Sequence, residues 1–148
     1  MRSEFKRVFA IAVFAIYLLG VLHHTLGLYL LAVRKLFKPN LMVRGIEFSP
    51  EFNLIPFTNT ALITFNLNIL LFIPFGLLLP IATKVKSFGK VILMGFLTSL
   101  LIELMQLGIG GRITDVNDLM TNTFGCLIGY GIYKIIERLR TNYEKKKV

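Results

Sequence analysis

LTSLLIELMQLGIGGRITDVNDLMTNTFGCLIG, residues 97–129, is the stretch that decides the fold of this chain. Its pattern predicts two apolar helical segments that meet at a glycine-rich turn. Polar side chains that are costly in an apolar chain gather within it, and they are Glu103, Gln106, Arg112, Asp115, Asp118 and Asn122. Because intramembrane polar groups usually mark function, we expect these residues to form one site.

The composition favours an integral membrane protein. The chain has 148 residues, 55% of them hydrophobic, and a mean hydropathy of +0.69. A bilayer core of roughly 30 Å requires about 20 apolar residues in a helix. Four runs meet this length, at residues 8–32, 61–82, 89–107 and 117–136. We therefore predict an all-α fold, a polytopic bundle of four transmembrane helices within a single domain, residues 1–148.

The basic residues predict how this bundle sits in the membrane. The net charge is +9, but the 17 Lys and Arg residues lie mostly at the ends of the apolar runs, which favours membrane topology over nucleic-acid binding. If both termini and the 83–90 loop share one side, that side carries twelve of the 17. The positive-inside rule then predicts cytoplasmic termini and an outer loop at residues 33–60.

Polar residues in the second and third runs predict contacts between helices. Asn68 carries a side-chain amide that needs a partner from another helix in hydrocarbon. Ser99, Glu103 and Gln106 recur at spacings of four and three, so they share one helix face. Because a carboxylate inside a membrane costs about 2.5–3.5 kcal/mol on insertion scales, we expect Glu103 to be paired, protonated or near water.

The fourth run begins with a carboxylate and continues with a polar and glycine face. Asp115 is suited to cap the helix by accepting from free backbone donors. Asp118 and Asn122 join Gly125 and Gly129 along one face at spacings of four, three and four. Glycines four residues apart allow another helix to approach closely, so we expect this face to be buried, by packing within the chain more simply than by dimerisation.

Several features leave two interpretations open. The turn at residues 108–112 could present backbone amides to an anion beside Arg112, or could simply join two helices. The apolar segment 52–57 could cover the site or anchor in the interface.

The histidines and the cysteine have simpler explanations than catalysis. For His23 and His24 we favour an interior hydrogen bond and an interfacial side chain over a catalytic role. The single cysteine, Cys126, excludes an internal disulfide and gives no metal-ligand spacing, so we expect a packing residue and no metal or cofactor.

With this topology, seven polar residues fall at one level of the membrane, the outer leaflet and its water boundary. We predict that they bind a ligand there: Asn68, Glu103, Gln106, Arg112, Asp115, Asp118 and Asn122. A structural network of salt bridges would give the same pattern.

These residues resemble a known family. The patterns Asn68-x5-Pro74-x-Gly76, Ser99-x3-Glu103-x2-Gln106 and Gly111-Arg112-x2-Asp115-x2-Asp118-x3-Asn122-x2-Gly125-x3-Gly129 are similar to the VanZ-like family of small bacterial membrane proteins. The segment Asn-Leu-Ile-Pro-Phe at 53–57 resembles its upstream element, so the likeness spans about residues 53–129. His23 and His24 do not map onto that pattern. The resemblance implies a multi-pass protein of the bacterial plasma membrane with a role in low-level resistance to glycopeptides such as teicoplanin.

Three functions follow as hypotheses. The first is binding of an envelope component, such as a cell-wall precursor or a lipid head group, at the outer polar site. The second is an enzyme that modifies a lipid-linked envelope precursor, with Glu103 or Asp118 as the catalytic acid or base. Asp115 and Asp118 could hold Mg²⁺ or Ca²⁺, although this spacing is a weak signal. The third is a small structural or transport partner of the envelope machinery; the oligomeric state is left open.

Overall fold

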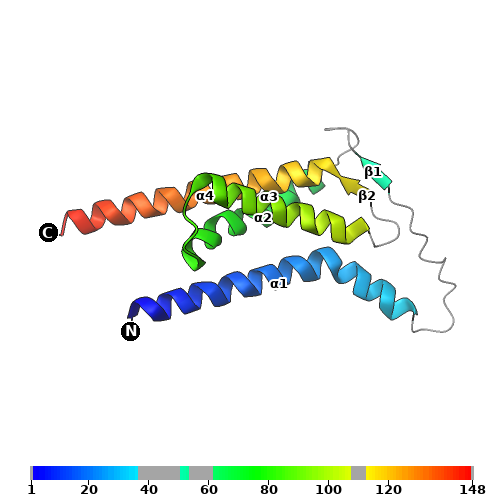
Figure 1. The fold of residues 1–148 in the computed structure, drawn as a ribbon, viewed down its shortest axis with the longest axis horizontal. Helices are drawn as coiled ribbons and strands as arrows, with labels where there is room; N and C mark the ends of the chain where they lie inside the picture. The colour runs from blue at the N-terminus through cyan, green and yellow to red at the C-terminus, as the bar shows by residue number, and fades with distance from the viewer. Residues whose placement is uncertain (1, 37–50, 54–61, 108–112, 148) are drawn as a thin grey trace.

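Four helices build the protein (Figure 1), as the sequence predicts. The computed structural model describes residues 2–36, 51–53, 62–107 and 113–147. The helices are α1 (Arg2–Leu36), α2 (Leu62–Ala82), α3 (Phe88–Leu107) and α4 (Val116–Lys145). Two short strands accompany them, β1 (Glu51–Asn53) and β2 (Ile113–Asp115).

The first and last helices, α1 and α4, extend beyond the apolar runs from which they are predicted. Helix α1 starts at Arg2, ahead of the run 8–32, and α4 continues past residue 136 to Lys145. Hydropathy marks only the apolar part of a helix, whereas polar residues of good helix propensity prolong it. In the extension of α4, Arg140 Nε donates to Glu144 Oε1 at 3.0 Å, an i,i+4 pair that supports the helix.

Helices α2 and α4 pack most closely, and glycines make this contact. A Cβ at Gly125 would lie 2.2 Å from the Ile69 carbonyl oxygen, and one at Gly129 would lie 2.0 Å from that of Ile73. A Cβ at Gly76 would approach a backbone oxygen of α4 to 1.9 Å. The contacts advance together along both helices, so α2 and α4 run parallel. The glycine face thus packs within the chain, as predicted.

Helices α1 and α3 join this pair through hydrogen bonds and side-chain packing. The Tyr17 hydroxyl of α1 donates to the Leu71 carbonyl of α2 at 2.7 Å. The ring of Phe14 meets Phe75 edge to face, with centroids 5.6 Å apart. On α3, Gly95 provides the space in which the buried Cys126 side chain of α4 lies. Cys126 is therefore a packing residue.

The strands form a short parallel ladder that the sequence does not predict. Glu51 pairs with Ile113, Phe52 with Thr114 and Asn53 with Asp115. This ladder fixes part of the 33–60 segment directly ahead of α4. The remainder of the apolar segment 52–57 lies outside the described residues, so the choice between cover and anchor stays open for it.

The two ends of the bundle differ. The N- and C-termini lie toward the same end as the α2–α3 turn, and the strands lie at the opposite end (Figure 1). We call these the terminal end and the strand end. Helices α1 and α3 each contain a segment long and apolar enough to cross a membrane, Arg7–His24 and Phe88–Gln106, and α2 contains a shorter apolar segment, Asn66–Ala82. Large apolar side chains such as Ile16, Leu101 and Leu139 are exposed, which is typical of a lipid-facing surface.

Candidate functional site

A cavity of about 420 Å³ lies toward the strand end of the bundle, where polar side chains from all four helices meet. We call it the polar pocket. Its polar lining residues are His24 of α1, Asn68 of α2, Glu103 and Gln106 of α3, and Asp118 and Asn122 of α4. Apolar residues of α2 and α3, among them Leu71, Phe72 and Ile102, complete its walls.

A direct hydrogen bond joins two sides of the polar pocket. Asn68 Nδ2 of α2 donates to Asp118 Oδ1 of α4 at 2.6 Å. The short distance fits a hydrogen bond to a charged acceptor. The prediction that Asn68 needs a partner from another helix is confirmed. Because α2 and α4 pack closely and in parallel, with the Ile69 carbonyl against Gly125, the Asn68 side chain lies within reach of Asp118.

The third side of the polar pocket is the polar face of α3. Glu103 is only 3% exposed and Gln106 4% exposed. The backbone N–H of Asp115 approaches Glu103 Oε2 at 3.4 Å, a long contact that links the end of α3 to the start of α4. Burial of a carboxyl group is costly unless other groups compensate. The buried carboxyl group of Glu103 is therefore the strongest indication that this face of α3 belongs to a site and not to a lipid-facing surface.

Asp115 has a structural position beside the polar pocket and does not line it. Its Oδ1 accepts from the backbone N–H and from the side-chain Nδ2 of Asn117, both at 2.8 Å. Its Oδ2 accepts from Asn53 Nδ2 at 3.1 Å, across the strand ladder. Asp115 thus caps α4, as predicted, and also ties the 51–53 segment to that cap.

Asn122 lies deeper in the polar pocket than the cap. Its side chain is 5% exposed, and its Nδ2 donates to Ser99 Oγ of α3 at 2.9 Å. This bond joins the polar face of α3 to that of α4. The side-chain oxygen of Asn122 is buried and has no hydrogen-bond partner within the described part of the chain.

The structure brings together five of the seven residues predicted to bind a ligand. These are Asn68, Glu103, Gln106, Asp118 and Asn122, and all of them line the polar pocket. Asp115 lies at the cap, and Arg112 lies outside the described residues. Within the described ranges, no group of three or more His, Cys, Asp and Glu side chains could hold a metal ion.

His24 is the lining residue that the predicted set leaves out. Both histidines are exposed, but His24 lines the polar pocket and His23 does not. Adjacent helical residues diverge by about 100°, so one of them can line a cavity while its neighbour points away from it. Two histidines in the first apolar run were the sequence signal that could have pointed to this residue. Helical periodicity alone does not show which of the two lines the pocket.

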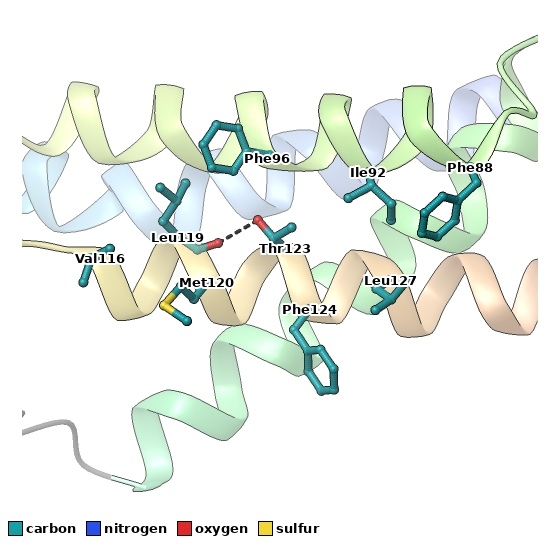
Figure 2. A pocket seen from close by; sticks show the side chains of 9 residues that line it. All are labelled: Phe88, Ile92, Phe96, Val116, Leu119, Met120, Thr123, Phe124 and Leu127. Atoms are coloured by element: carbon teal, nitrogen blue, oxygen red, sulfur yellow. Dashed lines mark hydrogen bonds between the residues drawn. The ribbon is translucent and has the colours of Figure 1, made fainter. Parts of the chain in front are cut away.

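A second cavity lies on the other side of α4 and is apolar. It has a volume of about 490 Å³ and runs between α3 and α4 (Figure 2). We call it the apolar groove. Its lining residues are Phe88, Ile92, Phe96, Val116, Leu119, Met120, Thr123, Phe124 and Leu127. Its one hydroxyl, on Thr123, donates to the Leu119 carbonyl of the same helix at 2.7 Å. The groove therefore presents carbon and sulfur atoms.

Comparison with known proteins gives a family and one curated relative. The family model described as VanZ/LLP1 matches residues 9–137. Protein VanZ of Enterococcus faecium is 37% identical over 82 residues, which are 55% of this chain and 51% of that protein. The chain thus aligns with about half the length of that relative. No solved structure matches the chain.

The family match begins within α1 and ends before the charged extension of α4, and it includes every residue that lines the polar pocket. With the two apolar helical segments, it indicates a membrane protein. The chain belongs to the VanZ/LLP1 family.

Proposed function

We propose that this protein binds the polar head of a cell-envelope component in the polar pocket and contributes in this way to low-level resistance to glycopeptides such as teicoplanin. The observation that carries the proposal is the convergence of polar side chains from α2, α3 and α4 on one cavity. Membership of the VanZ/LLP1 family and the likeness to Protein VanZ support the link to resistance.

We also propose that all four helices of one domain cross the plasma membrane, with both termini in the cytoplasm. The basic residues at the terminal end, including Lys84, Lys86 and Lys134, support this orientation through the positive-inside rule. The shared position of both termini and the α2–α3 turn also supports it. The polar pocket then lies in the outer leaflet, at the level of head groups and envelope precursors.

Cysteine labelling tests the orientation. In a Cys126→Ala background, Asn53→Cys lies at the strand end and Lys86→Cys lies at the terminal end. A membrane-impermeant maleimide added to intact cells should label the first and spare the second until the cells are opened. The reverse pattern would contradict the proposed orientation and place the polar pocket inside.

Substitution of the two carboxylates that line the pocket tests the binding proposal. Glu103→Gln and Asp118→Asn keep the size of each side chain but remove its charge. Each should return a resistant host to the teicoplanin susceptibility of a strain that lacks the protein, at equal amounts of protein in the membrane. Glu137→Gln is the matched control, because Glu137 lies at the terminal end, far from the pocket in sequence and structure. Unchanged resistance in both pocket variants would sink the proposal.

A second candidate is an enzyme that modifies a lipid-linked envelope precursor. It is favoured by one observation, the presence of Glu103, Asp118 and His24 in the lining of the same cavity. Such groups can exchange protons with a substrate when they lie within reach of it. Mass spectrometry of lipid-linked precursors and cell wall, with and without the protein, separates the two functions. A new or missing species would favour the enzyme, and identical profiles with intact resistance would favour binding.

A further inference from the structure

The side-chain oxygen of Asn122 is the feature of the polar pocket that no contact within the described residues explains. The residue is 5% exposed and lines the pocket, and its oxygen is buried without a donor. The amide nitrogen is held by Ser99 Oγ, which fixes the orientation of the side chain. Leaving a buried acceptor without a donor costs about 1–3 kcal/mol. A bound group that supplies a hydrogen atom would recover this cost.

The rest of the lining shows which kind of donor fits. Glu103 and Asp118 bring two carboxylates to the same cavity, and Asn68 already directs its amide nitrogen to Asp118. Among the described lining residues there is no Lys or Arg, and His24 is the one basic side chain. A positively charged donor gains a charge-assisted hydrogen bond and attraction to the carboxylates. A phosphate or a carboxylate would meet charges of its own sign.

We propose that the polar pocket takes a primary ammonium group that donates an N–H to Asn122 Oδ1 and lies beside the carboxylates of Glu103 and Asp118. This inference rests on the proposed function and names the ligand class for the same site. Two sources carry this chemistry at the outer membrane surface: an ethanolamine phospholipid and an aminated sugar of an envelope component. A quaternary ammonium has the same charge but no N–H, so it provides the discriminating probe.

Binding of three lipids with identical acyl chains tests the proposal. The purified full-length protein in detergent is titrated with phosphatidylethanolamine, phosphatidylcholine and phosphatidylglycerol, and bound lipid is counted by native mass spectrometry. The ethanolamine lipid should bind at least about tenfold more tightly than the other two, a difference of about 1.4 kcal/mol. Equal binding of the ethanolamine and choline lipids, or preference for the anionic lipid, would overturn the proposal. Glucosamine should displace the ethanolamine lipid if the pocket accepts a sugar amine, and its failure to do so would assign the site to the lipid.

Two variants of Asn122 assign the preference to that side chain. Asn122→Leu removes the oxygen and should reduce the preference for the ethanolamine lipid to about twofold or less. Asn122→Asp keeps an acceptor oxygen and should retain it. Thr121→Ala is the control, because Thr121 is buried on the same helix but bonds to the Asn117 carbonyl and does not line the pocket. If Asn122→Leu does not fold, the selectivity of the wild-type protein still decides the outcome.

The same variants separate this inference from the proposed function. Loss of resistance in Asn122→Leu without any ethanolamine preference in the wild type would contradict the ammonium ligand and leave the binding site in place. Unchanged resistance in Asn122→Leu together with no lipid selectivity would count against both. Loss of resistance and loss of the ethanolamine preference together would support both.

Discussion

The polar pocket and the apolar groove lie on opposite sides of α4, are similar in volume and differ in chemistry. The pocket has about 420 Å³ and the groove about 490 Å³, so size does not distinguish them. Two adjacent residues of α4 show how the cavities differ in chemistry. Asn122 faces the pocket and keeps a buried oxygen without a partner in the described part of the chain, whereas Thr123 faces the groove and satisfies its hydroxyl on its own helix.

This comparison shows that α4 carries a polar surface on one side and an apolar surface on the other. Lipid tails are as apolar as the side chains of the groove, so they can fill it without leaving any polar group unsatisfied. They cannot fill the pocket in the same way, because they offer no donor to the side-chain oxygen of Asn122. The polar face of α4, rather than the size of a cavity, marks the candidate site.

The largest expected effect comes from separating α2 from α4, which form two sides of the pocket. Gly129→Ala would place a Cβ 2.0 Å from the Ile73 carbonyl oxygen, so the helices must move apart. We expect a loss of about 1–3 kcal/mol or more in the free energy of unfolding. Thermal unfolding in detergent measures it. Gly131→Ala is the matched control, because nothing lies within 4 Å of its added Cβ, and it should leave stability unchanged or slightly raised. Equal melting of both variants would contradict the close packing.

A smaller effect is expected when the bond across the pocket is removed. Asn68→Ala deletes the donor to Asp118 and should cost about 0.6 kcal/mol, the average coupling measured for hydrogen bonds between membrane helices, and at most about 1.7 kcal/mol. A double-mutant cycle with Asp118→Ala gives the coupling energy directly. Asn66→Ala, two residues away on the exposed side of α2, should show no coupling to Asp118. A coupling of zero for Asn68 would mean that this bond does not hold the two sides together.

Substitutions in the groove should have a still smaller effect. Phe96→Ala and Leu127→Ala remove side chains that are partly exposed, and lipid or detergent can replace their contacts. We expect changes within about 0.5 kcal/mol and unchanged teicoplanin susceptibility. Melting curves and susceptibility tests at equal protein levels measure both. Loss of resistance in either variant would make the groove a second site and remove the contrast on which the comparison rests.

The smallest effect is expected at the terminal end, away from both cavities. The hydrogen bond from Lys134, and then that from Tyr133, lowers the pKa of Glu137, which lies beyond the apolar run 117–136. A carboxyl group whose pKa falls on folding stabilises the fold above its unfolded pKa of about 4.3, and this contribution disappears as the pH falls through the folded pKa. The melting difference between wild type and Glu137→Gln should therefore be greatest near neutral pH and vanish in acid. A difference that grows in acid would contradict the sign.

The sequence predicted much of the site because helical spacing is visible in one dimension. The spacing of Ser99, Glu103 and Gln106 placed them on one buried face of α3. The spacing of Asp118 and Asn122 placed both on the side of α4 that lines the pocket. It predicted the cap at Asp115 but could not exclude this residue from the ligand-binding set, because a capping carboxylate and a pocket carboxylate have the same chemistry. Nor could it choose His24 over His23, since the rotation of α1 against α2 depends on packing such as that of Tyr17 on Leu71.

The sequence by itself determined the four helices, the polar faces of α3 and α4, the cap at Asp115 and the family resemblance, because each is a local or periodic property. Only the tertiary structure decided the parallel contact of α2 with α4, the ladder between β1 and β2, the bond from Asn68 to Asp118 and the buried oxygen of Asn122. Each of these depends on groups from segments far apart in the chain. Their distances are set by how closely the helices pack, and spacing along one helix does not contain that information.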